Sequence, residues 1–419
     1  MGQRPRSLQP ALSARHLFGA HLRQCRVDRG LSQRGLGRLV HISGDLIGKI
    51  EKGERKANSD LAQRCDSLLG YSGKLVELWA AVEAEERGVQ AAPGTVEREA
   101  VLAYLPSIRH VLDSYDLPEE GPIPAMHEVR AGVGRLVGMR LASQYVGLAE
   151  ELPSALTSFL RAYHGSSGQR RAELAQLLTQ AFRAADAIAD KFALYDLSAR
   201  IIGILQAMAA ESGDEATIAT AAYVRAEVFF ASGHWDTGRR MLERAADAVS
   251  SAVDGPAAAA YGALHMRAAV LAARASRLDQ ANAHIAEAAA TAAHVDEGVY
   301  TGTAFGPASV QIHRMSLAVD VGDPADALRL ADSWSPPLTV PAERRSHFFV
   351  DLADAQTRCE QPGEALATLQ VARRIAPQHV RYHPQVKAAL LTLASRLPSD
   401  PPALRELTRW TGVSAELRS

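Results

Sequence analysis

Cysteine, aromatic residues and long apolar runs are all scarce in this sequence. Its 419 residues include three cysteines, Cys25, Cys65 and Cys359, which form no CxxC pair and leave an odd count. A disulfide framework and a structural zinc site are therefore not expected. No window of about 18 uncharged apolar residues occurs, and the basic N-terminus has no apolar core of signal-peptide length. These absences predict a reduced, cytoplasmic protein with no membrane span.

The sequence also lacks the motifs of common enzyme active sites. It has no HExxH, no GxxxxGKS/T, no GxSxG and no GxGxxG placed after a strand. His379 and His383 lie four residues apart, but no third metal ligand is evident and Pro377 and Pro384 flank them. This setting favours a surface histidine pair over a zinc site. We therefore expect no enzyme activity, no cofactor and no metal.

Strand patterns are missing as well. Val and Ile are thinly spread, alternation with a period of two residues is absent, and Ala, Leu, Glu and Arg dominate. The four dominant residues are strong helix formers. Residues 255–295 hold 18 alanines, a density that lets helices approach closely. The sequence predicts an all-α fold.

Charge divides the chain into a basic head and an acidic body. The formal net charge is −1, but residues 1–75 hold 14 Lys and Arg against 6 Asp and Glu, whereas the remainder holds 32 against 41. A basic head suggests a polyanionic partner for that part alone. Proline and glycine breaks mark three predicted regions: a basic unit at 15–87, a connector with one helix at 88–124, and long amphipathic helices over 125–419.

The basic unit has the pattern of two short helices joined by a tight turn. Ser32 and Ser43 are placed to cap helices over 33–40 and 44–51. Leu39 is expected on the buried face of the first of these helices, with further short helices before and after the pair. Basic residues flank the second helix.

The run LSQRGLGRLVHISGDLIGKIEKGER, residues 31–55, resembles the Cro/repressor-type (Xre) helix-turn-helix family. The resemblance covers about 55 residues, and it rests on the joint spacing of Leu31-Ser32-Gln33, Leu36-Gly37, Ile42-Ser43, Ile47, Ile50-Glu51 and Gly53. It implies that the second helix enters a DNA major groove roughly 12 Å wide while basic flanks hold phosphates. The DNA-binding residues that it implies are Gln33, Arg34, Ser43, Gly44, Asp45, Gly48, Lys49, Lys52, Arg55 and Lys56.

Within the resemblance, Gln33 takes a phosphate-contacting position at a helix N-terminus, and the residues from Ser43 to Lys49 take the groove-facing positions. Lys52, Arg55 and Lys56 follow as backbone clamps. The sequence departs from the usual pattern because its groove-facing positions hold two glycines and one acid. Lys49 could address guanine and Asp45 the amino group of cytosine, and the thin inventory favours a contribution from DNA shape.

The acidic body repeats itself. Segments 224–246, 265–289, 311–334 and 349–374 align, with turn positions at Gly233, Ser276, Gly322 and Glu360 and small second-helix positions at Gly238, Ala281, Ala327 and Ala365. Small residues at such points let antiparallel helices and the next pair nest closely. Residues 129–164 and 170–212 are interpreted as two more divergent hairpins, and 381–410 as a terminal cap.

This pattern is similar to the tetratricopeptide repeat (TPR) family, although the spacings of 43, 46 and 38 residues between second-helix positions exceed the roughly 34 of that family. Related helical-hairpin repeats are an alternative. The resemblance implies a concave groove lined by the first helix of each pair, suited to a peptide or a polar small molecule. The groove residues that it implies are Tyr223, Glu227, Phe230, Arg274, His347, Asp354 and Arg358.

Taken together, the regions resemble the peptide-sensing helix-turn-helix regulators that carry TPR-type domains. The resemblance implies a bacterial transcription regulator that binds double-stranded DNA as a homodimer and responds to a signal peptide or small molecule. The alternative is a protein-interaction adaptor whose head has lost DNA binding, which the glycines at 44 and 48 would fit. The sequence does not disclose the operator, the ligand or the dimer interface.

Overall fold

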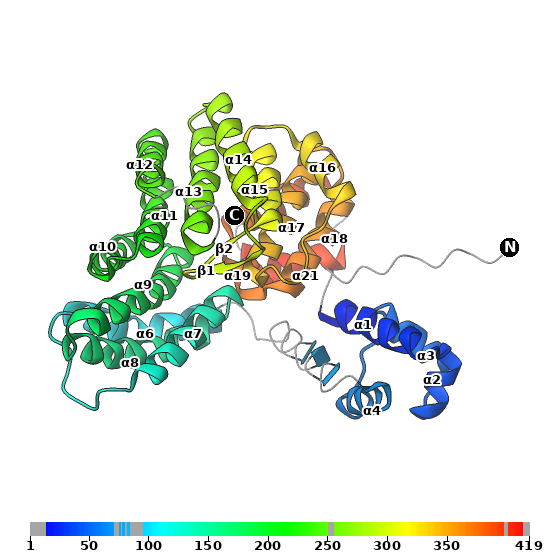
Figure 1. The fold of residues 1–419 in the computed structure, drawn as a ribbon. Helices are drawn as coiled ribbons and strands as arrows, with labels where there is room; N and C mark the ends of the chain where they lie inside the picture. Colours follow the sequence, from blue (N-terminus) through cyan, green and yellow to red (C-terminus); the bar gives the residue numbers. More distant parts are fainter. Residues whose placement is uncertain are drawn as a thin grey trace.

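The computed structural model describes residues 14–70, 75–76, 78–79, 82–83, 95–249, 255–397 and 401–413. These residues form twenty helices and one two-stranded hairpin (Figure 1). The predicted fold class, an all-α chain with an N-terminal helix-turn-helix followed by helical hairpins, is confirmed. Among the described helices, none combines the length and the apolar character needed to cross a membrane.

The head consists of four short helices: α1 (Ala14–Asp28), α2 (Gln33–Leu39), α3 (Gly44–Glu51) and α4 (Ser59–Leu69). The two predicted caps are confirmed, because the hydroxyl of Ser32 accepts from the amide of Gly35 at 3.0 Å and that of Ser43 accepts from the amide of Leu46 at 3.1 Å. Each cap satisfies an amide that the first turn of its helix leaves without a backbone partner.

The head has its own hydrophobic core, in which Leu22, Leu36, Ile47 and Leu69 are fully buried. Leu39 was predicted to belong to this core, and that prediction was wrong: its side chain is 49% exposed. In the seven-residue helix α2, the buried stripe passes through Leu36 and Gly37 to Val40, and position 39 falls on the opposite side.

The body is a series of helical hairpins that follow α6 (Thr95–Asp113) (Figure 1). The pairs are α7 (Met126–Leu141) with α8 (Tyr145–His164), α9 (Gly168–Lys191) with α10 (Tyr195–Ser212), α11 (Glu215–Ser232) with α12 (Trp235–Asp247), α13 (Gly255–Arg274) with α14 (Leu278–Ala292), α15 (Pro307–Asp320) with α16 (Pro324–Ser333), and α17 (Ala342–Arg358) with α18 (Pro362–Ile375). Helix α6, which the sequence placed in the connector, packs against α8 and shares its hydrophobic core.

The aligned turn positions of the repeats have one backbone conformation. Gly233, Ser276, Gly322 and Glu360 all have a positive φ, between 59° and 84°. Left-handed residues at this point end one helix and turn the chain back for the next. Four positions chosen by sequence alignment thus share a conformation that non-glycine residues rarely adopt, which confirms the predicted register of the repeats.

The small second-helix positions lie where the pairs pack most closely. Ala281, Ala327 and Ala365 are at most 1% exposed. A side chain added at Gly238 would place its Cβ 2.7 Å from the Cβ of Phe229 in the preceding helix. A larger residue would therefore separate the two helices of the pair.

The C-terminal helices α19 (Pro377–Tyr382), α20 (Pro384–Arg396) and α21 (Pro402–Thr411) bring the end of the array back to its beginning (Figure 1). The backbone amide of Tyr145 donates to the side-chain oxygen of Gln378 at 2.6 Å, and the rings of Phe192 and Tyr382 lie 4.8 Å apart. Arg381 forms a buried ion pair of 3.1 Å with Glu97 of α6. The hairpins therefore surround a central space.

The strands β1 (Gly298–Tyr300) and β2 (Thr303–Phe305) form an antiparallel hairpin that the sequence did not predict. Its two-residue turn, Thr301-Gly302, has positive φ at both positions, as a tight hairpin turn requires. Phe305 is fully buried against Gly262 of α13. With three residues a strand, the hairpin is too short to give a periodic sequence signal.

Candidate functional site

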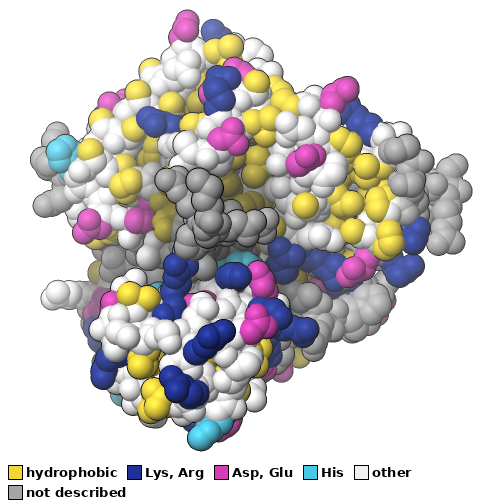
Figure 2. All heavy atoms as spheres, turned by 90° about the vertical axis from the view of Figure 1, so that its right-hand side faces the viewer, with side chains coloured by type: hydrophobic (Ala, Val, Ile, Leu, Met, Phe, Trp, Pro, Cys, Tyr) yellow, Lys and Arg dark blue, Asp and Glu magenta, His cyan; other side chains and the backbone are white. Residues whose placement is uncertain are grey.

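The polar side of α3 faces solvent. Ser43, Asp45, Lys49 and Lys52 are exposed, while Ile47 and Ile50 on the other side are buried in the head core. Figure 2 looks onto the head, the lower lobe of that view, where Lys and Arg side chains are more frequent than acids. The helix can therefore present its outer side to a partner without unfolding of the head.

The two glycines of α3 lie against α2. A Cβ at Gly44 would come within 2.9 Å of the backbone of Arg34, and one at Gly48 would lie 3.2 Å from the side-chain oxygen of Gln33. Gly48 is buried and Gly44 half-buried. Close packing of α2 on α3 thus gives a structural reason for glycine at both positions, and neither glycine presents a side chain outward.

A buried network fixes the relative positions of α1, α2 and α3. Arg26 donates to both carboxylate oxygens of Glu51, at 2.5 and 3.0 Å, and Gln33 donates to the same carboxylate at 2.8 Å. Glu51 is only 2% exposed, so an unpaired carboxylate there would be strongly unfavourable. Gln33 is consequently held at the N-terminus of α2 next to the outer face of α3.

The remaining predicted DNA-binding residues are cations: Arg34 in α2, Lys49 in α3, and Lys52, Arg55 and Lys56 after α3. Lys49 pairs with Asp45 at 2.8 Å one turn earlier, and Lys56 pairs with Glu83. Lys52 lies 4.0 Å from Glu54. Arg34 and Arg55 are exposed and form no ion pair within the part of the chain that the structure describes.

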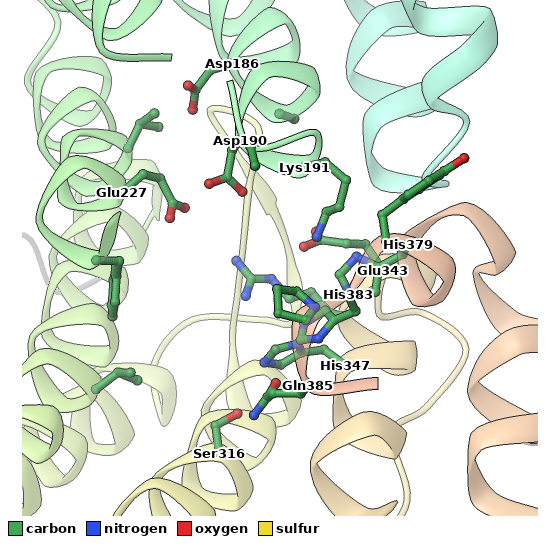
Figure 3. A pocket seen from close by; sticks show the side chains of 18 of the residues that line it. Asp186, Asp190, Lys191, Glu227, Ser316, Glu343, His347, His379, His383 and Gln385 are labelled. Atoms are coloured by element: carbon green, nitrogen blue, oxygen red, sulfur yellow. The ribbon is translucent and has the colours of Figure 1, made fainter. Parts of the chain in front are cut away.

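The body encloses a cavity of about 570 Å³ between its hairpins. Its walls come mainly from the first helix of each pair, α7, α9, α11, α13, α15 and α17, and from α19 and the start of α20. Figure 3 shows charged side chains from several of these helices pointing toward one another. A volume of this size is in the range of small-molecule sites.

Five of the seven predicted groove residues line this cavity: Tyr223, Glu227, Phe230, Arg274 and His347. The other two, Asp354 and Arg358, lie farther along α17 outside the lining, where they form an ion pair of 2.8 Å. Arg358 also donates to the backbone oxygen of Val319, at 3.1 Å. The structure thus brings the first five together and leaves the last pair apart.

Four largely buried arginines, Arg140, Arg183, Arg267 and Arg344, are the cavity's most distinctive feature, and none of them was predicted from the sequence. Arg140 donates to the backbone oxygen of Gly302 and Arg183 to the hydroxyl of Thr303, both on the β-hairpin. Arg344 donates to the hydroxyl of the buried Tyr223 at 2.7 Å, and the guanidinium of the fourth, Arg267, lies 4.4 Å from the centre of that tyrosine ring.

The arginines perturb one another and their neighbours. Burial and, after it, the nearby charge of Arg140 lower the pKa of Arg183 to about 9. Burial alone would raise the pKa of Glu343, but the adjacent charges of Arg344 and Arg140 lower it to about 2. Cations held this close, in surroundings that disfavour charge, create a positive potential suited to an anionic group.

Two acids of α9, the helix that also carries Arg183, have the reverse perturbation. Burial raises the pKa of Asp186 to about 8, and its carboxyl accepts from the hydroxyl of Ser198 at 2.6 Å. Burial, with the charge of Glu227, raises the pKa of Asp190 to about 6. Near neutral pH Asp186 is therefore mostly protonated, whereas Asp190 is mostly ionised.

The histidines of the C-terminal segment also line the cavity. His379 and His383 were predicted to be a surface pair, and that prediction was wrong: they are 2% and 8% exposed. Helix α19 turns them inward, where His347 of α17 joins them, and the three offer nitrogen atoms that all lie within 4.8 Å of one another (Figure 3). Burial lowers the pKa of both His379 and His383 well below the usual value.

The comparisons with known proteins bear mainly on the head. No curated protein matches the chain. A solved structure of PlcR from Bacillus thuringiensis, in complex with the peptide PapR7 and DNA, is similar over 89% of this chain and 98% of that one, with 11% identity and a TM-score of 0.31. The fold and sites described above do not depend on that likeness. The helix-turn-helix domain family matches residues 17–79, so the N-terminal part of this chain is a helix-turn-helix domain.

Proposed function

We propose that the chain is a sequence-specific DNA-binding transcription regulator, a bacterial cytoplasmic protein that acts as a homodimer. In this proposal α1 to α4 bind DNA, and the helical body from α6 onward binds a signal that controls DNA binding. The observation that carries the proposal is the helix-turn-helix domain, whose α3 has an exposed polar side and is followed by the cations Lys52, Arg55 and Lys56.

The DNA-binding part rests on geometry and charge together. Helix α3 is exposed along its outer side and short enough to enter a major groove, as the second helix of this motif does. Gln33 at the start of α2, with Lys52, Arg55 and Lys56 after α3, is placed to contact phosphates on either side. In this role Ser43, Asp45 and Lys49 face base edges, while Gly44 and Gly48 let α2 and α3 pack closely.

The signal-binding part rests on the arginine wall of the cavity. Arg140, Arg183, Arg267 and Arg344 offer several guanidinium groups to one enclosed space, and such groups bind carboxylates with paired, charge-assisted hydrogen bonds. We therefore assign the signal a carboxylate, as on a short peptide with a free C-terminus or on a small organic acid. Tyr223, Glu227 and Phe230 would contact its remaining part.

Homodimerisation would connect the two halves of the function. One head reads few base pairs, and half-sites on DNA lie about 34–36 Å apart, so two heads must be held at that separation. A ligand that changes the curvature of the hairpin array by several Å would move the heads out of register. Because α19 contacts α6 and α8, the two ends of the hairpin array are joined, and a change in its curvature would involve both ends together.

The test is a fluorescence-anisotropy titration of the full chain on a duplex from the region upstream of its own gene. Wild type should bind with an affinity that falls steeply with salt, because each neutralised phosphate releases counterions. Lys49→Ala with Arg55→Ala should weaken binding by about 10-fold or more and reduce the salt slope by about 2. Arg409→Ala, at an exposed arginine of α21, is the matched control and should change neither.

The same titration separates the regulator from the adaptor. If the parent protein forms no DNA complex at low salt but still captures a protein partner through its body, the adaptor interpretation replaces the regulator. If a DNA complex forms and is insensitive to salt, phosphate neutralisation by these cations is contradicted.

A second arm repeats the titration with pools of short peptides that carry either a free or an amidated C-terminus. Free-acid peptides should change DNA affinity by a larger factor than their amides at equal dimer content, because only the acid pairs with the arginine wall. A response to small organic acids but to neither peptide pool would identify a non-peptide signal. Equal affinity under all these conditions would refute the assignment of a carboxylate signal.

A further inference from the structure

Three histidines from two segments of the chain converge at one side of the cavity. His347 comes from the middle of α17, His379 from α19, and His383 from the junction of α19 and α20. Each offers a ring nitrogen, and these atoms all lie within 4.8 Å of one another. Figure 3 shows the three rings gathered on one side of the cavity.

Two of these rings are buried with nitrogen atoms that form no hydrogen bond within the described residues. Both ring nitrogens of His379 are of this kind, and so is Nδ1 of His383. A neutral imidazole has one donor and one acceptor, and buried polar groups of native proteins nearly always have partners. A shared ion would satisfy the acceptor nitrogens of all three rings at once.

The third ring, that of His347, lies beside a carboxylate. Its Nε2 lies 3.6 Å from the carboxylate of Asp351, which is 1% exposed and itself accepts from the hydroxyl of Ser316 at 2.5 Å. Metal-binding histidines commonly face such a carboxylate through the nitrogen that does not bind the ion, and the contact fixes the ring and its tautomer.

The charges around the cluster are mixed. Lys191 of α9, Arg140 of α7 and Arg344 of α17 lie on the cavity lining near the rings, and these cations oppose a metal ion. The carboxylates of Glu343 and Asp351 lie beside the same rings and offset them, and Figure 3 shows Glu343 and Lys191 next to His379. The setting is polar, and its two carboxylates offset all but one of the three cations.

We propose that His347, His379 and His383 together bind one divalent transition-metal ion, of which zinc is the best fit. Neutral imidazole is a favoured ligand of zinc, and three histidines leave one coordination position open, here toward the cavity. Nitrogens around tetrahedral zinc lie about 3.4 Å apart, as Zn–N bonds of about 2.05 Å require. Binding would therefore draw nitrogens that now lie within 4.8 Å of one another to that closer separation.

The test uses the untagged full chain, stripped with a chelator and titrated with Co²⁺ and then with Zn²⁺ in competition. Co²⁺ should give visible absorption that saturates at one equivalent per chain and is displaced by Zn²⁺. His379→Gln and His383→Gln should each weaken binding by about 100-fold or more, and Asp351→Asn by about 10- to 100-fold. His294→Gln, at an exposed histidine outside the cluster, is the matched control and should bind as wild type does.

Absence of stoichiometric binding by wild type, or unchanged binding in both His379→Gln and His383→Gln, would overturn the proposal. Far-ultraviolet circular dichroism of each variant shows whether it has folded. If both buried variants fail to fold, His347→Gln at the half-buried member decides, and unchanged binding there also refutes the site. The metal titration contains no DNA and no peptide. A negative result there would not contradict the proposed regulator function, and a negative result in the DNA titration would not contradict the metal site.

Discussion

At the scale of single residues, Asp45 is the unusual member of the outer face of α3. It is exposed in the first turn and forms an ion pair of 2.8 Å with Lys49, and its hydrogen bond with Lys49 lowers its pKa. The carboxylate is therefore ionised on a surface that we propose meets phosphates. It also engages the one lysine of α3 that points outward.

Asp45→Asn should raise the affinity for DNA by about fivefold, whatever the DNA sequence. Removing one exposed like charge near a phosphate relieves a repulsion, and Lys49 is released for DNA. Anisotropy titrations with the upstream duplex and with an unrelated duplex would measure the gain. A loss of affinity confined to the upstream duplex would contradict this account and would identify Asp45 as a reader of a base, such as the amino group of cytosine.

The roles of the helix caps could be predicted from the sequence, whereas those of the buried arginines could not. Ser32 and Ser43 were predictable as caps, because a cap depends on neighbours within three residues. Arg140 and Arg183 were not, because an arginine on a helix usually lies on a solvated face, and their partners Gly302 and Thr303 are more than a hundred residues away in sequence. The inward orientation of His379 likewise depends on the packing of α19 against segments that are far away in the sequence.

At the scale of elements, the β-hairpin depends on a glycine in a neighbouring helix. Phe305 of β2 fills the space where Gly262 of α13 has no side chain. Through Gly302 and Thr303 the hairpin also holds Arg140 and Arg183 of the cavity wall. Its position is therefore coupled to the geometry of the proposed signal site.

Gly262→Ala should lower the free energy of unfolding by about 1–3 kcal/mol, because the added methyl group would overlap the ring of Phe305 in a close-packed region. Gly203→Ala is the matched control: Gly203 is exposed in α10 with no atom near the added methyl, so the better helix propensity of alanine should stabilise the chain by up to about 1 kcal/mol. Thermal melting of both variants gives the comparison. If Gly262→Ala melts at or above the temperature of wild type, Phe305 does not pack closely against Gly262, and this account of the hairpin's position is contradicted.

At the scale of the whole molecule, the repeats were predictable and the closure of the array was not. Small residues and left-handed turns recur with each pair, so alignment of the sequence with itself finds them. Closure depends on the curvature summed over six hairpins, which no single repeat contains. The contacts that close the array, Arg381 with Glu97 and Gln378 with Tyr145, join residues more than 230 positions apart.

The body also buries ionisable groups, and their burial makes its stability depend on pH. Burial raises the pKa of Asp186 to about 8, far above the roughly 3.9 of an unfolded aspartate. The folded chain then binds a proton that the unfolded chain has lost, so this contribution to stability is complete below about pH 4 and disappears as the pH rises to 8.

The free energy of unfolding should therefore fall by about 1 kcal/mol between pH 7 and pH 8, a range above the titration of ordinary histidines. Denaturant titrations of wild type and Asp186→Asn at pH 6.5, 7, 7.5 and 8 would measure the slope. The asparagine has nearly the same shape, can still accept from Ser198, and cannot ionise, so its profile should be flatter by about that amount. Parallel profiles for the two proteins would mean that Asp186 is ionised in the folded chain at neutral pH. A carboxylate signal would then meet a further negative charge at Asp186 of α9 rather than a neutral carboxyl group.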